Sequence, residues 1–464
     1  MENNQLNFTG VTADSRKVRP GFVFIAIQGE EQDGNQFIDE AVQKGAKLII
    51  TEKDLIQRNI PYLQVKDARK ALGNMNALFY SLFKNNIKVI GVTGTNGKTT
   101  TTKMIEKIFR ESEKEIILIS EKNITTPSSE KISESLYRAN KKGIHWAVME
   151  VSSHGLKQRR VESIDFDTAI FTNISNDHLD YHKSFEDYFS SKKILFQGLK
   201  ENKRAIINGD DSWSLKLLEG KKNIYVITYG LNPKSTITAS SIDIGEKIRF
   251  NYCLQRSLDS YQKNKIEVQE FPIEMNLLGY HNIYNALAAI TTALIYEIPV
   301  DTIQRALKSF KTVHRRLELI QTLPYVILDD YAHNPNSFET AFQTLQSIDY
   351  KDIHIIVAIR GNRGIKVNQE NAQTIANWCS LLNIENLYIT ESEDFVTERD
   401  RVQSIERQVF LNTLKQKNIS FHFHTSLEES IKNLLSQIEK NDLIMLLGSQ
   451  GMDQGVNVLK KLLQ

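Results

Sequence analysis

Cysteine is scarce in this sequence, and long hydrophobic runs are missing from it. The 464 residues include two cysteines, Cys253 and Cys379, whose wide separation does not suggest a disulfide framework. No window approaches the roughly 18 apolar residues of a membrane span, and the N-terminus lacks a basic-then-apolar signal. The sequence therefore predicts a protein of a reducing compartment, the cytoplasm, without membrane insertion.

A strong excess of charge of one sign is missing as well. The net charge is +2 with 25% charged residues, which indicates neither a nucleic-acid-binding nor a membrane-binding surface. We find no internal repeat and no low-complexity tract. A chain of this length can bury a large core and divide into about two to four domains. The composition is that of a globular, multidomain protein without nucleic acid as a partner.

What the sequence does contain is a glycine-rich turn between a strand and a helix. The apolar run 89–92 enters the turn Gly94-Thr-Asn-Gly-Lys-Thr99, and apolar residues then recur at helical spacing as far as Phe109. In a phosphate-binding loop, Lys98 approaches the β/γ-phosphates and the Thr99 hydroxyl approaches Mg²⁺. The general pattern has a glycine where Val92 stands, so the alternative is an incidental turn. Strand, turn and helix together favour the phosphate site.

Two further segments carry possible metal ligands. Glu150 lies near the end of a predicted strand, where a carboxylate beside a phosphate loop suits a metal, although a lone strand-end glutamate is usually solvated. The segment Asn173–His182 follows another predicted strand and holds two His and two Asp within six residues. It is either a polar loop or a second metal site. Lys192 follows in a predicted helix over 185–196, where a lysine is ordinarily a surface residue.

Strands that alternate with helices predict three α/β units with mostly parallel, helix-covered sheets. We expect the units to span residues 1–86, 87–312 and 313–464. Strands are predicted at 22–27, 48–51, 116–120, 146–151, 168–172, 205–208, 224–229, 325–328, 353–359, 387–390 and 443–447. Residues 235–276 alternate in polarity and predict antiparallel strands.

Two pairs of polar residues each have two interpretations. Asn282 and Asn285 either cap the helix that follows them or read a nucleotide base, and capping is the simpler explanation. Arg315 and Arg316 either belong to a solvated linker or neutralise phosphate charge from a moving domain.

Taken together, these blocks resemble the Mur ligases, most closely those of the MurE type. The resemblance covers nearly the whole chain in order. It rests on Gly94–Thr99, Glu150–Leu156, Thr172–His182, Gly279–Asn285 and Asp330–Pro335. It implies a small α/β UDP-binding domain, a central P-loop domain with a mostly parallel sheet, and a C-terminal Rossmann-like domain that binds the amino acid.

The resemblance also implies a reaction and its cofactors, ATP and Mg²⁺. ATP phosphorylates the D-Glu carboxylate of UDP-N-acetylmuramyl-L-Ala-D-Glu, and an amino acid attacks the acyl phosphate to give an amide in peptidoglycan precursor synthesis. By resemblance, the catalytic residues are Lys98, Glu150, His178 and Lys192, with metal held by Thr99, Glu150, His178 and the carbamylated Lys192. We expect a monomer.

Nucleotide and substrate contacts follow from the same resemblance. The residues implied for the nucleotide are Gly94, Thr95, Asn96, Gly97, Lys98, Thr99, Thr100, Asn282, Arg316 and Asp330. Those implied for the muramyl peptide are Ser15, Thr125, Thr126, Ser152, Gln158 and Arg160. Ser15 belongs to the segment Asp14-Ser-Arg16, which resembles the uridine-binding module.

The departures from the family pattern lie in the third unit. An Asp-Asn-Pro motif is missing from Ile389–Phe395, Gly448–Asp453 replaces a Gly-Lys-Gly-His-Glu segment, and Gly361–Gly364 lacks the aspartate of a Gly-Asp-Arg segment. The acceptor is therefore open between L-lysine, diaminopimelate and another amine. Two alternative functions remain: a MurE-like or cyanophycin-synthetase-like paralogue acting on a different carboxylate, and a non-catalytic regulator that binds a nucleotide sugar.

Overall fold

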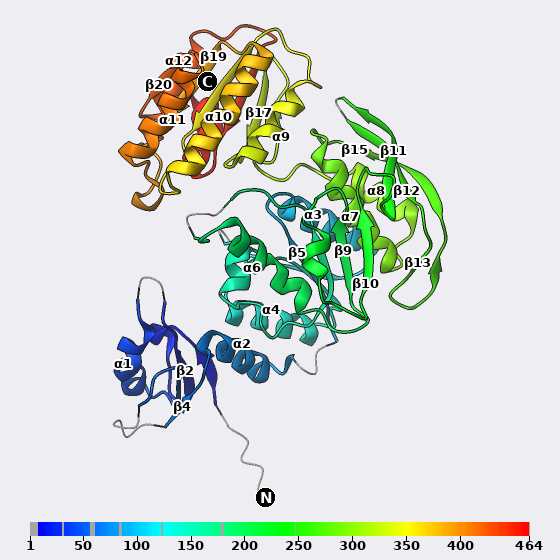
Figure 1. The fold of residues 1–464 in the computed structure, drawn as a ribbon, viewed down its shortest axis with the longest axis vertical. Helices are drawn as coiled ribbons and strands as arrows, with labels where there is room; N and C mark the ends of the chain where they lie inside the picture. The colour runs from blue at the N-terminus through cyan, green and yellow to red at the C-terminus, as the bar shows by residue number, and fades with distance from the viewer. Residues whose placement is uncertain are drawn as a thin grey trace, which may run out of the picture.

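The computed structural model describes residues 8–29, 32–55, 61–82, 86–121, 124–177, 181–245 and 247–463. These residues form three α/β domains, each built on its own sheet (Figure 1). In Figure 1 the first domain is blue, the central domain runs from cyan to green, and the third runs from yellow to red. The three-domain α/β architecture agrees with the prediction from the sequence.

The first domain is a four-stranded parallel sheet with strands in chain order. Alternation along β2 sends Phe24 and Ala26 toward α1, and Val23 and Ile25 toward α2. The elements are β1 (Gly10–Thr12), β2 (Phe22–Ala26), β3 (Leu48–Thr51), β4 (Tyr62–Gln64), α1 (Ile38–Gln43) and α2 (Ala68–Phe79), with short 3₁₀ turns at Ser15–Lys17 and Gly34–Phe37. Helix α2 also packs against α4 (Ser129–Lys141) of the central domain.

The central domain is organised around a nine-stranded sheet, in the order β15-β12-β11-β10-β9-β8-β5-β7-β6. Strands β6 to β11 pair in parallel, and β11, β12 and β15 are antiparallel, as the alternation over 235–276 predicted. The strands are β5 (Lys88–Thr93), β6 (Ile116–Ile119), β7 (Trp146–Glu150), β8 (Phe166–Phe171), β9 (Arg204–Asn208), β10 (Tyr225–Tyr229), β11 (Ile237–Ile244), β12 (Ile248–Leu254) and β15 (Gln269–Met275), with a small hairpin of β13 (Leu258–Asp259) and β14 (Lys265–Ile266).

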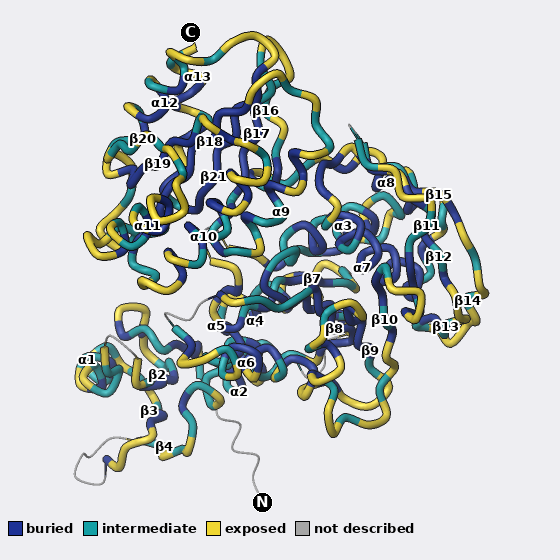
Figure 2. The backbone as a smooth tube through the Cα atoms, turned by 45° about the horizontal axis from the view of Figure 1, so that its top comes forward, coloured by how far each residue is buried: buried dark blue, intermediate teal, exposed yellow. Residues whose placement is uncertain are grey.

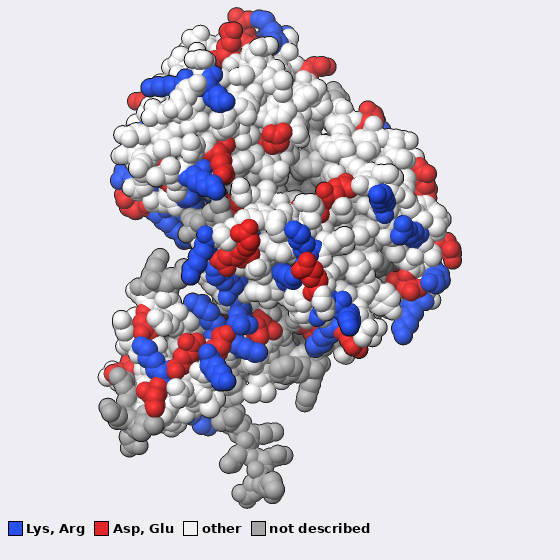
Figure 3. All heavy atoms as spheres, in the orientation of Figure 1, with Lys and Arg blue, Asp and Glu red and all other residues white. Residues whose placement is uncertain are grey.

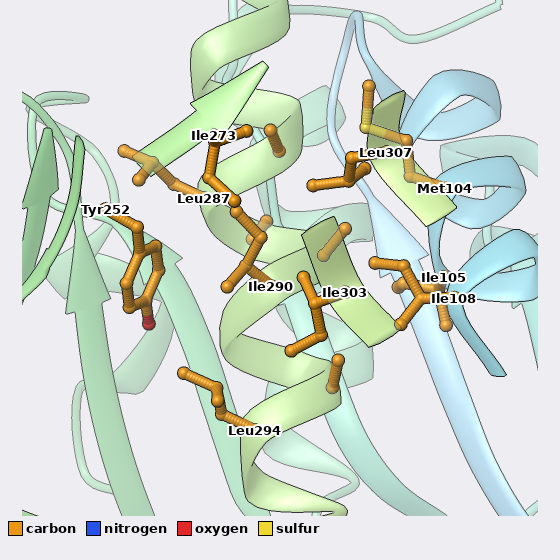
Figure 4. Close-up of a cluster of buried hydrophobic side chains, with 14 of the residues drawn as sticks. Met104, Ile105, Ile108, Tyr252, Ile273, Leu287, Ile290, Leu294, Ile303 and Leu307 are labelled. Atoms are coloured by element: carbon orange, nitrogen blue, oxygen red, sulfur yellow. The ribbon is translucent and has the colours of Figure 1, made fainter. Parts of the chain in front are cut away.

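Helices cover both faces of the central sheet. The helices are α3 (Lys98–Glu111), α4 (Ser129–Lys141), α5 (Ser153–Lys157), α6 (Phe185–Gln197), α7 (His281–Ile295) and α8 (Val300–Lys308), with a 3₁₀ turn at Leu215–Leu218. On one face, α3, α7 and α8 share one buried cluster, in which Ile303 of α8 lies between Ile290 of α7 and Ile105 of α3 (Figure 4). Helices α4 and α6 pack on the other face. Figure 2 shows the strands between these layers as buried.

The third domain is a six-stranded sheet in the order β16-β17-β21-β18-β19-β20, parallel except for the edge strand β16. Its strands are β16 (Glu318–Gln321), β17 (Val326–Asp330), β18 (Ile353–Ala358), β19 (Asn386–Thr390), β20 (His422–His424) and β21 (Leu443–Leu447). Its helices are α9 (Pro335–Leu345), α10 (Ile365–Leu382), α11 (Ser404–Gln416), α12 (Leu427–Leu435) and α13 (Gly455–Leu462), with 3₁₀ turns at Glu398–Asp400 and Gln450–Met452.

The predicted strands are confirmed, with ends that differ by at most two residues. The largest differences are at β8, which starts at Phe166 instead of 168, and at β17, which runs on to Asp330 instead of ending at 328. Ladder hydrogen bonds with neighbouring strands set these ends, and a local pattern does not contain that information.

Figure 3 shows acidic and basic side chains interspersed on the surface, with basic side chains gathered where the first domain meets the central domain.

The packing of α7 generates a stability prediction. Leu287→Ala should lower the free energy of unfolding by about 3 kcal/mol, because Leu287 is fully buried in the central core and its removal leaves a cavity. The control Leu215→Ala removes the same atoms from a side chain that is 69% exposed, and should change stability by less than about 0.5 kcal/mol. Urea unfolding of the two variants measures the difference. Equal losses would contradict this account of the core.

Candidate active site

The glycine-rich turn lies between β5 and α3, as predicted. Residues Gly97 to Thr100 at the start of α3 line a cavity of about 970 Å³. The first amides of a helix have no partners within it, so this end of α3 can bind an anion. The Lys98 Nζ donates hydrogen bonds to the carbonyl oxygens of Gly94 (3.0 Å) and Thr95 (2.7 Å). A loop of this shape can hold phosphates.

Two glycines of the turn are required by its geometry. A Cβ at Gly94 would lie 1.8 Å from the Thr172 hydroxyl oxygen, so the loop packs directly on the end of β8. Gly97 has φ +83°, and a Cβ there would lie 2.4 Å from the Asn285 side-chain oxygen. The turn therefore fits between β8 and α7 only without side chains at these two positions.

Glu150 at the end of β7 faces the turn. The Thr99 hydroxyl donates a hydrogen bond to a Glu150 carboxylate oxygen at 3.0 Å. Burial raises the pKa of Glu150, and the nearby Lys98 charge opposes that rise. A hydroxyl and a carboxylate together at a phosphate loop are oxygen ligands of the kind that Mg²⁺ takes, so these two residues fit the predicted metal position.

Lys192 points inward from α6, while its neighbour Lys193 points outward and pairs with Glu219 at 2.9 Å. The Lys192 ammonium is fully buried and donates a hydrogen bond to the Gly94 carbonyl at 2.8 Å. Burial, assisted by the charge of Lys98, lowers the pKa of Lys192 well below its usual value. The amine is therefore held in a place that favours its neutral form.

His178 was predicted as a metal ligand, but residues 178–180 lie outside the described part of the chain. Asp177, directly before them, is buried and meets three groups of the third domain. The Asn334 amide and the Arg360 guanidinium donate to its carboxylate, each at 3.2 Å, and His333 Nε2 lies 3.6 Å from it. Among the described residues, no three His, Cys, Asp or Glu side chains form a metal-binding group.

The two arginines at the start of the third domain have different surroundings. Arg315 is buried and is not part of a solvated linker: its guanidinium pairs with Asp329 at 3.2 Å and donates to the carbonyls of Gly448 and Ser449. Arg316 lines the cavity. Asp330 also lines it; burial raises the pKa of this carboxyl to about 6, and the Arg316 charge opposes the rise.

The structure separates the two asparagines of α7. Asn282 is not the N-cap, which is Tyr280, and it does not line the cavity. Its amide donates to the Leu278 carbonyl at 2.7 Å, and its side-chain oxygen accepts from Asn285 at 2.9 Å. Asn285 lines the cavity. The capping interpretation is therefore wrong, and Asn282 touches the site through Asn285.

The residues predicted for the muramyl peptide line the same cavity: Thr125, Thr126, Ser152, Gln158 and Arg160. Arg160 donates to the Thr126 carbonyl at 2.6 Å and to the Gln158 side-chain oxygen at 2.7 Å. Ser15 lines a second cavity of about 740 Å³ between the first and central domains, where its hydroxyl donates to Glu40 at 2.7 Å. Gln158 and Arg160 line both cavities, so the two are neighbours.

Several cavity residues were not singled out from the sequence. They are His154, Asp177, His281, Tyr284, Tyr331, His333, Arg360, Arg363 and Arg399. Six of them lie inside the sequence blocks that carry the family resemblance: His154, Asp177, His281, Tyr284, Tyr331 and His333. Arg363 lies in the segment Gly361–Gly364, which departs from the family pattern. Arg360 lies just past the end of a parallel strand, which is a position where site residues are expected. For Arg399 we find no signal in the sequence.

Comparisons with known proteins agree with this geometry. Family models match at residues 7–80 (Mur ligase family, catalytic domain), 92–293 (Mur ligase middle domain) and 315–450 (Mur ligase, glutamate ligase domain). This chain is similar in sequence to UDP-N-acetylmuramoyl-L-alanyl-D-glutamate–2,6-diaminopimelate ligases. That of Oceanobacillus iheyensis is 31% identical over 96% of this chain and 90% of the relative, and that of Fusobacterium nucleatum is 33% identical with the same coverage.

A solved structure supports the fold. The MurF ligase of Thermotoga maritima in complex with ADP superposes with a TM-score of 0.71 at 20% identity, over 99% of this chain and 98% of that one. The chain belongs to the Mur ligase family and is an ATP-dependent ligase. None of its described helices is long and apolar enough to cross a membrane.

The environment of Asp330 predicts a pH effect. A carboxyl whose pKa rises from 3.8 to about 6 on folding binds its proton more tightly in the folded state, so its contribution to stability falls as the pH rises through this range. Asp330→Asn should therefore gain about 1 kcal/mol relative to the wild type between pH 5 and pH 8.

Urea unfolding of both proteins across that range measures this gain. The control is Asp349→Asn, an exposed carboxylate of the same domain, whose difference from the wild type should stay flat. A flat difference for Asp330→Asn as well would show that burial does not control this group.

Proposed function

We propose that this chain joins an amino acid to the D-Glu carboxylate of UDP-N-acetylmuramyl-L-Ala-D-Glu, using ATP, in peptidoglycan precursor synthesis. The observation that carries the proposal is the pair of neighbouring cavities that share Gln158 and Arg160. One opens at the phosphate loop and the other at Ser15. An extended substrate with a nucleotide at one end and a carboxylate at the other fits such a path.

In this proposal the γ-phosphoryl group moves from ATP to a carboxylate oxygen. The amine nitrogen then bonds to the acyl carbon, phosphate leaves, and the amine loses a proton, so that the products are an amide, ADP and phosphate. Lys98 and the amides from Gly97 onward hold the phosphates and neutralise their charge. Thr100 and Arg316 flank the phosphates, Asp330 faces the ribose, and Asn282 supports the adenine contact through Asn285.

The metal ligands in the proposal are Thr99, Glu150, His178 and a carbamate on Lys192. Bound Mg²⁺ would supply charge neutralisation for the transferred phosphoryl group. Two observations support Lys192: its complete burial, and a lowered pKa that leaves the amine free to react with CO₂. Carbamylation would convert a buried ammonium that has a carbonyl partner into an anionic ligand beside Lys98.

The proposal extends to organisation and location. We place the domain boundaries as predicted, at 1–86 for UDP binding, 87–312 for ATP chemistry and 313–464 for the amino acid. We expect a monomer that acts in the cytoplasm, where ATP and UDP-linked precursors are made.

A phosphate-release assay tests the reaction. Purified protein with ATP, Mg²⁺ and UDP-N-acetylmuramyl-L-Ala-D-Glu should release phosphate when the right amino acid is present, and mass spectrometry should detect the amide. No release with any member of a broad amino-acid panel, together with no binding of the muramyl dipeptide, would favour a paralogue with a different carboxylate substrate. Binding of the muramyl dipeptide without turnover would favour a regulator.

The role of Lys192 has its own test. Lys192→Ala should lower the rate of phosphate release by about a hundredfold or more, because a metal ligand is lost. Short-chain carboxylic acids should restore part of the rate by replacing the carbamate. The matched control, Lys193→Ala, removes the adjacent outward lysine and should leave the rate unchanged. A Lys192→Ala enzyme with full activity would exclude the carbamate.

A further inference from the structure

The third-domain wall of the active-site cavity carries an excess of positive charge. Residues 313–463 are described without a gap, and those lining the cavity include four arginines and one acid. The arginines are Arg316, Arg360, Arg363 and Arg399, and the acid is Asp330. Arg316 and Asp330 lie near each other at the phosphate end, where Arg316 also influences the pKa of Lys98. The other three arginines therefore face the cavity without an acid of their own domain on the same wall.

These three arginines are held on one preformed support. The buried carboxylate of Glu406 accepts hydrogen bonds from the backbone amides of Asn362, Arg363 and Gly364, at 2.9, 2.9 and 2.7 Å. Three successive amides around one carboxylate fix the loop after β18 in a single shape. The loop therefore presents the side chains of Arg360 and Arg363 from a rigid base.

Arg399 is attached to the same support. The Asn362 side-chain amide donates to the backbone carbonyls of Glu398 (3.2 Å) and Arg399 (3.1 Å). A Cβ at Gly361 would lie 2.2 Å from the Asp400 carbonyl oxygen, so the two segments touch through their backbones. The three arginines thus form one arrangement, which we call the arginine wall.

The arginine wall has unused capacity for anions. Arg363 pairs with Asp400 at 3.1 Å, and Arg360 pairs across the domains with Asp177 at 3.2 Å. The side chain of Arg360 is only 10% exposed, and its buried Nε has no hydrogen-bond partner among the described residues. Arg399 makes no ion pair with any residue of the described part of the chain. Two acids therefore face three guanidinium groups, each of which can bind a carboxylate through two N–H groups.

We propose that the acceptor of this ligase is an acidic amino acid, whose side chain ends in a carboxylate and carries no second ammonium group. This inference rests on the proposed function. The acceptor's carboxylates lie against the arginine wall, which leaves the α-amine toward the phosphate loop. A lysine side chain, or the distal ammonium of diaminopimelate, would meet guanidinium groups instead of a carboxylate, and such a like-charge contact is unfavourable.

The test compares acceptors in the phosphate-release assay at fixed UDP-muramyl dipeptide. The acceptors are L-glutamate, L-aspartate, 2-aminopimelate, diaminopimelate and L-lysine. The decisive pair is 2-aminopimelate and diaminopimelate, which differ only in the distal ammonium. We expect kcat/KM to be about tenfold to a hundredfold higher for the best acidic acceptor than for lysine, and higher for 2-aminopimelate than for diaminopimelate. The reverse order in either comparison would overturn the proposal.

Reversing the charge of Arg399 tests whether the arginine wall selects the acceptor. Arg399→Glu should lower kcat/KM for the acidic acceptor by about tenfold or more, and should reduce the ratio of kcat/KM for the acidic acceptor to that for lysine. Arg399→Lys should retain most of this ratio. The control is Arg401→Glu, an exposed neighbour that pairs with Glu398 and does not line the cavity. An equal loss in Arg401→Glu, or no loss in Arg399→Glu, would overturn the assignment.

Direct binding separates this proposal from the proposed function. Calorimetric titration of glutamate and of lysine into the protein with a non-hydrolysable ATP analogue and Mg²⁺ requires no turnover. If the muramyl dipeptide is not a substrate but glutamate binds more tightly than lysine, the proposal of an acidic acceptor is supported, and the proposed carboxylate substrate is wrong. If lysine binds more tightly, or neither binds, the acceptor class fails whatever the donor.

Discussion

The Gly94 carbonyl oxygen is the contact on which the rest of the site depends. It accepts hydrogen bonds from two side-chain nitrogens, that of the partly buried Lys98 at 3.0 Å and that of the buried Lys192 at 2.8 Å. Burial lowers the pKa of both lysines, and the charge of Lys98 lowers the pKa of Lys192 further. Glu150 and Asp177 partly offset this repulsion. The positive charge of Lys98 at the glycine-rich turn is therefore costly without a ligand, and the phosphates of ATP would offset that cost.

The same turn explains why the central sheet is built as it is. Gly94 can touch Thr172 only because β5 and β8 are adjacent parallel strands, whose carboxyl ends meet at one edge. The strand β7 on the other side of β5 brings Glu150 to the same edge. Helix α7 closes the turn from outside through Asn285. The strand order therefore brings Glu150, the glycine-rich turn and Thr172 together at one edge of the sheet.

Asp177 links the central domain to the third. Its carboxylate accepts hydrogen bonds from two residues of the third domain. Asn334 follows strand β17, and Arg360 follows strand β18. Asn334 also lies 3.5 Å from Asn96 of the phosphate loop. The third domain thus contacts the phosphate loop and its acidic neighbour at once, and Arg360 connects that contact with the arginine wall.

The sequence by itself determined the elements and much of the site. The resemblance to the Mur ligases, and not the pattern of the helix, singled out Lys192. Hydrophobic periodicity located the strands, and the glycine spacing located the phosphate loop. These are local properties, which depend on residues only a few positions apart. Only the tertiary structure decided that Arg315 is buried while Arg316 faces the cavity, and that Asn285 lines it in place of Asn282. It also paired Arg360 with Asp177, 183 residues away in the chain. The direction of one side chain at a domain junction depends on partners that are distant in sequence, and local patterns carry no information about them.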